Sequence, residues 1–256
     1  MPTTPSVAVV VALVVLTLLA VGVAAAGHLG TARQTATAAV RAVVQLCVVA
    51  LVITAVLGSL AWSLLFTAAM LGIAVHTTAR RVGAPRAWPW AAVAMASGIV
   101  PVLLVIFGTG AVPLDGPSLV PFAGIVTGGT MTAHSLMGRR VFAALRDERG
   151  AYEAALALGL LPRDAVDVVA ADVVPEALVP GMDQTRTVGL VTLPGAFVGV
   201  ILGGGTPAQA AAAQVLVLVG LLAAQSLTVT VAFQLVRRGR LVPDDLRSLV
   251  GRSSGA

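Results

Sequence analysis

Apolar segments about as long as a membrane is thick recur along nearly the whole chain and constrain its fold more than any other feature. A helix needs ~20 apolar residues to cross the hydrocarbon core of a bilayer. Seven segments approach this length, at about residues 7–26, 38–57, 60–78, 90–107, 118–137, 177–202 and 208–236. Because backbone groups in lipid must bond within their own segment, such segments are helical. The sequence therefore predicts an all-α polytopic membrane protein of about seven transmembrane helices, forming a single transmembrane domain over residues 1–256.

The basic residues gather on one side of these segments and predict an orientation. All 16 basic residues are Arg, and only 11% of the chain is charged. If the N-terminus lies outside, every Arg except Arg186 falls on the cytoplasmic side, as the positive-inside rule requires. We therefore expect an N-out/C-in, multi-pass protein of the cell membrane, surrounded by the lipid bilayer. Its basic tail is expected to fray after Arg247.

The same residue counts exclude several functions. A phosphate-binding P-loop needs a Lys, and this chain has none, so ATP and Mg would have to bind to a separate polypeptide. No cofactor and no enzymatic activity are expected in this chain, which lacks the zincin and nucleophile-elbow motifs. The excess of Arg reflects membrane orientation and predicts no nucleic-acid partner. His28, His76 and His134 are scattered, and His76 and His134 are expected at the cytoplasmic interface, so no metal site is predicted.

The one long polar interval, residues 138–176, has the pattern of a helix, a Gly and a second helix. Its first helix would end near a Gly, and a Pro is placed to begin the next. The spacing E-A-A-x-x-x-G resembles the cytoplasmic loop by which ABC importer permeases dock on their ATPase subunits. The alternative is an ordinary interfacial helix, and the importer pattern I-x-L-P that follows the Gly is absent. The candidate coupling residues are Glu153, Ala154, Ala155, Gly159, Pro162 and Arg163.

Three further stretches resemble one family. Residues 41–46, 121–128 and, most specifically, 183–195 are similar to the FetB-type permeases, the membrane subunits of a bacterial iron-export ABC system. Plant permeases linked to aluminium tolerance are related to them. The resemblance implies a permease homodimer that works with a separate cytoplasmic ABC ATPase and exports iron or a related metal species. The rival class is an ion-gradient-driven secondary transporter, which predicts inverted repeats and acidic sites at mid-membrane.

Polar residues within the apolar segments are candidates for a substrate path or gate. Asp183 and Arg186 are three residues apart, so on a helix they share a face and can pair. Either this polar block enters the membrane, where charges are usually functional, or it forms an interfacial elbow kinked at Pro180. Further path candidates are Gln45, Thr127, Thr130 and Met131, although Thr hydroxyls can also bond to their own helix.

Small residues repeat at four-residue intervals and predict close helix packing. Such spacing puts a flat face on a helix and lets another helix approach. For the later group, the packed partner is expected to be the second permease copy. The residues are Gly124, Gly128, Gly195, Gly199 and Gly203.

Overall fold

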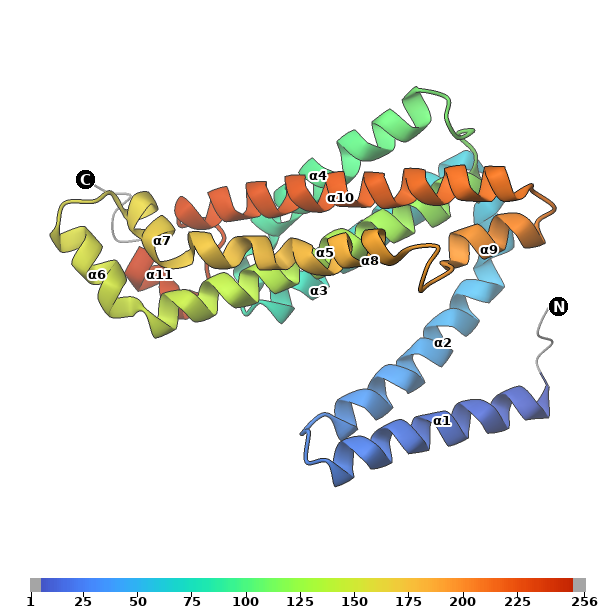
Figure 1. The fold of residues 1–256 in the computed structure, drawn as a ribbon, viewed down its shortest axis with the longest axis horizontal. Coiled ribbons are helices and arrows are strands. Elements are labelled where there is room, and N and C mark those ends of the chain that lie inside the picture. The colour runs from blue at the N-terminus through green and yellow to red at the C-terminus, as the bar shows by residue number, and fades with distance from the viewer. Residues whose placement is uncertain (1–5, 251–256) are drawn as a thin grey trace. The chain divides into compact units, whose positions relative to one another are not determined.

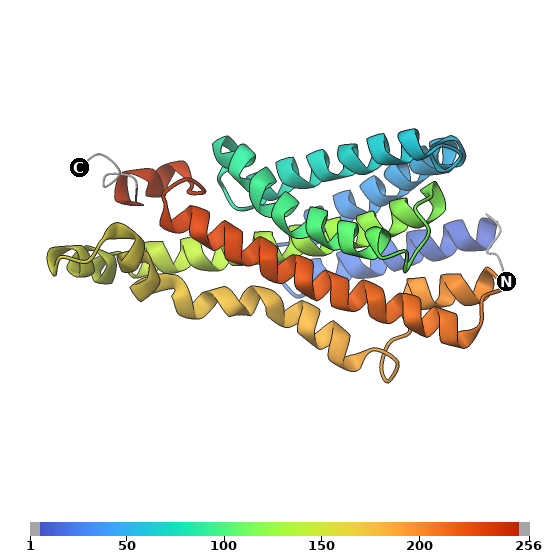
Figure 2. The same ribbon diagram turned by 90° about the horizontal axis from the view of Figure 1, so that it is seen from above.

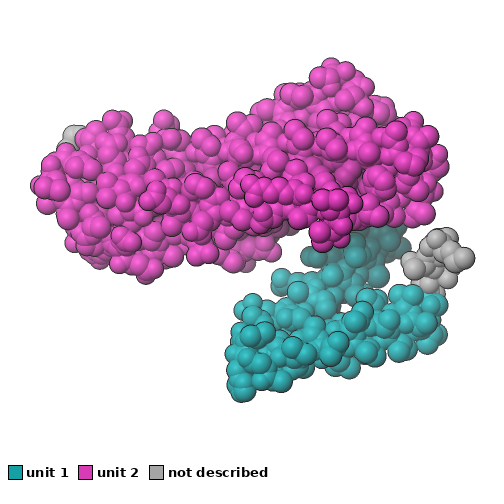
Figure 3. All heavy atoms as spheres, viewed as in Figure 1, with its two compact units in different colours: residues 1–58 teal, residues 59–256 magenta. Residues whose placement is uncertain are grey.

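The computed structural model describes residues 6–250, and within that range the protein is helical without a strand. The chain divides into two compact units, Met1–Gly58 and Ser59–Ala256, which Figure 3 colours separately. Arg252, which the predicted orientation counts, lies outside the described residues. A single domain over residues 1–256 stays a prediction.

The first unit is a pair of packed helices, α1 (Val7–Ala26) and α2 (Ala32–Leu57). Ser6 caps α1 by accepting a hydrogen bond from the backbone N–H of Val9. Within the unit, Ala24 is the buried residue of α1 and Val56 that of α2. Nearly all the Val and Leu side chains of both helices are therefore exposed, as expected for helices that face lipid.

The second unit contains the remaining helices and is shown in Figures 1 and 2. The start of α3, the α4–α5 loop and the α9–α10 turn lie at one end of this unit, whereas α6, α7 and α11 lie at the other. The Arg-rich segments share the second end, as the predicted orientation requires. The elements are α3 (Leu60–Arg81), η1 (Pro85–Ala87), α4 (Trp88–Gly108), α5 (Gly116–Asp147), α6 (Arg149–Ala157), α7 (Pro162–Ala170), η2 (Ala171–Leu178), α8 (Val179–Thr187), α9 (Gly195–Leu202), α10 (Pro207–Arg237) and α11 (Asp244–Val250).

Within residues 6–250, five helical segments are long and apolar enough to cross a membrane: α1, α2, α3, the stretch Pro85–Gly108 and α10. The predicted fifth span is also one continuous helix, α5, which is more polar. The predicted sixth span, residues 177–202, is wrong as a single helix, because α8 ends at Thr187 and α9 begins at Gly195. Gly189 has a positive φ of 79° between them, and Pro194 cannot donate a backbone hydrogen bond. The count of seven spans and the orientation stay predictions.

Cysteine labelling tests the orientation. In a Cys47→Ala background, Leu114→Cys and Ala208→Cys should react in intact cells with a membrane-impermeant thiol reagent, because both positions are exposed at the end without Arg clusters. Ala151→Cys and Ser248→Cys, exposed at the opposite end, should react only after the cells are opened. Labelling of Ala151→Cys in intact cells would reverse the predicted orientation.

The core of the second unit lies where α10 packs on α4 and α5, and α3 packs on α5. Met95 and Leu218 are among its fully buried side chains. The closest approach is at Gly98 of α4, where an added Cβ would collide with the carbonyl oxygen of Ala224 and the hydroxyl of Thr228 on α10. Gly98 therefore sets the distance between α4 and α10.

Gly98→Ala should lower the free energy of unfolding by ~1–3 kcal/mol, because overpacking forces the backbones apart. The matched control is Gly72→Ala on α3, where an added Cβ meets nothing within 4 Å. Thermal unfolding of both variants in detergent measures the difference. Equal unfolding midpoints for Gly98→Ala and Gly72→Ala would show that α4 and α10 can move apart without loss of stability.

Fraying directly after Arg247, which the sequence predicts, is wrong for residues 248–250, because they belong to α11; residues 251–256 lie outside the described residues. Within α11, Leu246 and Val250 are buried. Asp245 accepts two hydrogen bonds from Arg146 of α5, at 2.8 and 3.2 Å, and this guanidinium lowers the pKa of the Asp245 carboxyl. These contacts fasten the tail to the end of α5.

Candidate functional site

The predicted helix–turn–helix is present as α6 and α7, and we call the segment from Arg149 to Ala170 the knob. Gly159 ends the first helix with a positive φ of 91°, the left-handed conformation that favours Gly. Pro162 begins α7 in the first turn, where its missing N–H costs no hydrogen bond. Of the candidate coupling residues, Ala155 is buried, whereas Glu153, Ala154 and Arg163 have exposed or partly exposed side chains.

The turn of the knob carries three neighbouring leucines that face away from the protein. Leu158 is 82% exposed, Leu161 51% and Leu160 37%. They adjoin no apolar run that could enter a bilayer, since α6 and α7 are short and carry charges. Exposed apolar residues clustered on a polar segment are typical of a protein contact.

An ion pair joins the knob to α10. The Arg237 guanidinium lies 2.6 Å from Asp167 and 3.7 Å from Asp164, both on α7. The Arg237 side chain is only 22% exposed, so this contact is better shielded than the other ion pairs of the described residues. The sequence does not predict this pair, because Arg237 and the aspartates of α7 lie far apart along the chain.

Asp183 and Arg186 lie on one face of α8 with 3.5 Å between their charged atoms, as their spacing predicts. Their side chains are 60% and 72% exposed in the single chain. In water a pair this open contributes little to stability, roughly 0–1 kcal/mol. The contribution of this ion pair to stability therefore depends on whether water or lipid surrounds it in the membrane.

The neighbours of α8 place it along the middle of α5 and α10. An added Cβ at Gly181 would collide with the side chain of Gln225, which donates a 3.2 Å hydrogen bond to the carbonyl of Gly129. Gln184 shares a cavity with Leu218, further along α10. These partners lie within the predicted spans 118–137 and 208–236. The arrangement thus favours entry of the polar block into the membrane over an interfacial elbow, and Pro180 marks the start of α8.

The remaining path candidates differ in their surroundings. Thr130 is buried, and its hydroxyl donates hydrogen bonds to the carbonyls of Val126 and Thr127 in its own helix. This is the alternative role expected for a Thr that does not line a path. Thr127 is also buried, and Met131 is partly buried. Gln45 is exposed on α2 of the first unit.

His134 is fully buried within the chain, and its Nδ1 is 3.0 Å from the hydroxyl of Thr78. Its expected depth at the cytoplasmic interface stays a prediction. Ser135 extends this polar contact between α3 and α5, at 2.7 Å from Thr78. Among the described residues, no three His, Cys, Asp or Glu side chains gather as metal ligands.

The small residues predicted to pack closely are mostly open within this chain. An added Cβ would meet nothing within 4 Å at Gly128, Gly195 or Gly199, and at Gly124 it would approach only Met70. At Gly203 it would approach only backbone oxygens of its own helix. Packing against a second copy stays a prediction for these positions.

Comparison with known proteins finds relatives along most of the chain. A family model described as "Uncharacterised protein family (UPF0014)" matches residues 7–240. The UPF0014 membrane protein STAR2 of Oryza sativa subsp. japonica is 31% identical over 213 residues, 82% of this chain and 75% of that protein. The Probable iron export permease protein FetB of Escherichia coli (strain K12) is 31% identical over 147 residues, 57% of this chain and 56% of that protein. Protein ALUMINUM SENSITIVE 3 of Arabidopsis thaliana is 29% identical over 173 residues, 66% of this chain and 63% of its own length. No solved structure matches.

Proposed function

We propose a function from the premise that this chain belongs to the UPF0014 family and is a multi-pass membrane permease. Within that class it serves as the membrane subunit of an ABC-type exporter whose ATPase is a separate cytoplasmic polypeptide. Its cargo is iron or a related metal species, by similarity to a relative named as a probable iron export permease. The observation that carries the ATPase partnership is the knob, with its exposed leucine turn and its ion pair to α10.

The knob supplies both parts of a mechanical connection. The leucine turn offers an apolar surface that a cytoplasmic partner can cover, and an interface centre of this kind contributes most of a binding energy. Arg237 then ties α7 to the end of α10, so a displacement of the knob moves that helix. In turn, α10 packs on α4, α5, α8 and α9. It therefore also borders the interruption between α8 and α9, residues 188–194, which we call the break. ATP-driven closure of the partner would thus act on the helices around the break.

A second permease copy completes the membrane domain in this proposal. Asp183 and Arg186 lie beside the middle of α5 and α10, yet both side chains are largely exposed in the single chain. Charged groups at that depth avoid lipid and face protein or water. The outer face of α8 therefore belongs at an interface between two copies or at a water-filled path between them.

Reconstitution tests this function directly. The chain is co-expressed with a candidate ABC ATPase from the same organism, and the purified complex is placed in vesicles with the ATPase side outward. Because the knob faces the ATPase, iron should enter these inside-out vesicles only when ATP is supplied, and the two subunits should co-purify. An uncoupler that dissipates ion gradients should leave the uptake unchanged.

Two other outcomes of the same experiment would contradict the proposed function. Uptake without ATP that stops when the uncoupler is added would identify an ion-gradient-driven secondary transporter. Failure of the two proteins to co-purify, together with iron uptake that ignores ATP, would refute the ABC assignment. A catalytically inactive ATPase provides the control for ATP binding without hydrolysis.

A further inference from the structure

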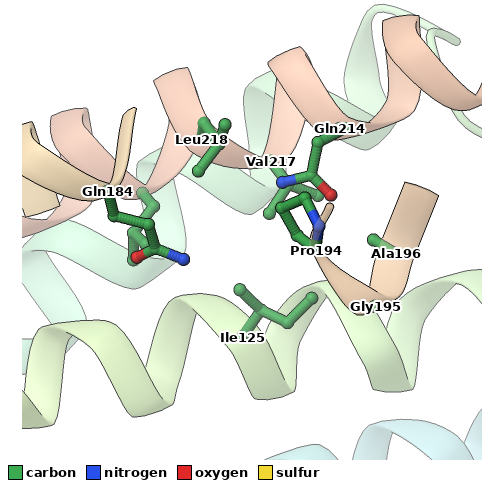
Figure 4. A pocket seen from close by; sticks show the side chains of 9 residues that line it. Ile125, Gln184, Pro194, Gly195, Ala196, Gln214, Val217 and Leu218 are labelled. Carbon is green, nitrogen blue, oxygen red and sulfur yellow. The ribbon is translucent and has the colours of Figure 1, made fainter. Parts of the chain in front are cut away.

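A cavity of about 360 Å³ lies at the break between α8 and α9, bordered also by α5 and α10 (Figure 4). All its lining residues belong to the second unit. Ligand pockets generally have volumes of roughly 300–1,000 Å³ and combine apolar walls with a few polar groups. Here Ile125 and Leu218 are among the apolar lining residues, and Gln184 and Gln214 supply the side-chain amides.

One of these amides has a buried oxygen without a hydrogen-bond partner in the described part of the chain. Gln214 is 4% exposed, and its Oε1 has no hydrogen-bond partner within the described part of the chain. Its amide points toward Pro194 and the start of α9, and the Gln184 amide enters the same space from α8 (Figure 4). Leaving a buried carbonyl oxygen without a donor is unfavourable, so a ligand in this cavity that carries a hydroxyl group or a metal-bound water could donate the hydrogen bond that the chain itself does not supply.

The start of α9 adds a second polar element. Pro194 caps this helix without a side-chain hydrogen bond, and Gly195 and Ala196 of the first turn line the cavity. Unpaired N–H groups and the helix dipole make such an end attractive to oxygen acceptors and unfavourable to cations. Discontinuous helices at mid-membrane form binding sites of this kind in other transporters.

The charge of the lining decides which ligand fits. Neither an acidic nor a basic side chain is among the residues that line the cavity. A bare metal cation would therefore lose its water without meeting a counter-charge, which is unfavourable in a poorly hydrated site. A ligand whose surface consists of oxygen atoms, with no net positive charge, can accept hydrogen bonds from the amide N–H groups and from the start of α9. A hydroxyl group or a metal-bound water on the same ligand can donate to Gln214 Oε1.

We infer that this cavity is the cargo site and that it takes a metal ion enclosed by an oxygen-donor chelator, neutral or anionic overall, and excludes the bare cation. The inference rests on the proposed function for the presence of a metal in the cargo. It identifies Gln184 and Gln214 as substrate-binding residues, and it assigns the break between α8 and α9 to recognition of the chelator.

Binding to the purified full chain in lipid nanodiscs tests this inference without any ATPase. The probes are ferric citrate, ferrous iron alone under anaerobic conditions, and citrate as a competitor, with retained iron measured by equilibrium dialysis. Wild-type protein should retain ferric citrate, release it to excess citrate and retain no ferrous iron. Gln184→Glu and Gln214→Glu should each weaken retention of ferric citrate by roughly ten-fold or more, because a carboxylate repels an anionic chelate.

Gln209→Glu is the matched control, since it makes the same change on the same helix as Gln214 but at an exposed position outside the cavity. A Glu also suits the capping box that Gln209 forms with Thr206. Retention of ferric citrate by Gln209→Glu should therefore stay within about two-fold of wild type. Because Gln184 is exposed, Gln184→Glu keeps the test valid if Gln214→Glu fails to fold. Retention of ferrous iron by the wild type would overturn the inference in favour of a cation site. Absence of ferric citrate retention by the wild type would overturn it as well, and ATP-driven iron uptake by the complex in inside-out vesicles would then show that the proposed function survives.

Discussion

Leu158→Asp should reduce ATP-driven transport by roughly ten-fold or more, because a charge at the centre of an apolar contact costs on the order of 2 kcal/mol or more. Leu158 is 82% exposed, so the change removes little packing within the permease and should leave insertion and folding intact. Co-purification with the ATPase and ATP-dependent iron uptake measure the effect. Ala151→Asp is the matched control, since it adds the same charge to an exposed position at the other end of α6.

The conformation of the turn provides a companion test of the same surface. Gly159 has a φ of 91°, so Gly159→Val should distort the turn that presents Leu158, whereas Gly159→Asn should be milder because Asn tolerates the left-handed region. Transport should therefore fall in the order wild type, Asn variant, Val variant. Normal transport in both Leu158→Asp and Gly159→Val would show that the knob is only a surface helix pair.

Features that depend on local sequence could be predicted. The apolar runs gave the approximate limits of α1, α2, α3, α4 and α10, because helix length in a membrane follows from bilayer thickness. The knob could also be predicted, since a Gly that ends one helix and a Pro that begins the next act through their own backbone geometry. The pair Asp183 and Arg186 follows from helix periodicity alone.

Features that depend on the meeting of distant segments could not be predicted. Gly98 sets the approach of α10, and its role depends on Ala224 across the contact, which the four-residue spacing from Ala94 to Gly98 does not identify. The pairing of Arg237 with Asp167 joins segments far apart in the chain. The cavity was missed for the same reason, because Gln184 and Gln214 look like ordinary polar residues until the break in the sixth segment brings them together.

Asp183→Asn should lower both the amount of inserted protein and transport, because it leaves the Arg186 charge without its partner beside the middle of α5 and α10. Removing one partner of an ion pair costs roughly 3–5 kcal/mol where the pair is buried and near zero where water surrounds it. The change therefore reports what covers α8 in the assembled protein. Glu176→Gln is the matched control, because it breaks the 2.9 Å ion pair with Arg140 at the Arg-rich end, where both side chains are about half exposed.

Combining Asp183→Asn with Arg186→Gln distinguishes a moving pair from a structural one. The double variant removes the stranded charge, so protein levels should return toward those of the wild type. If the pair is broken and re-formed as the helices around the break move, transport should remain low in this well-folded variant, since the interaction that separates the two states is lost. Wild-type transport in the double variant would instead make the pair a structural contact and remove it from the mechanism. Measuring inserted protein and ATP-driven iron uptake for both single variants and the double variant separates these outcomes, because only a role in switching lowers transport after folding has recovered.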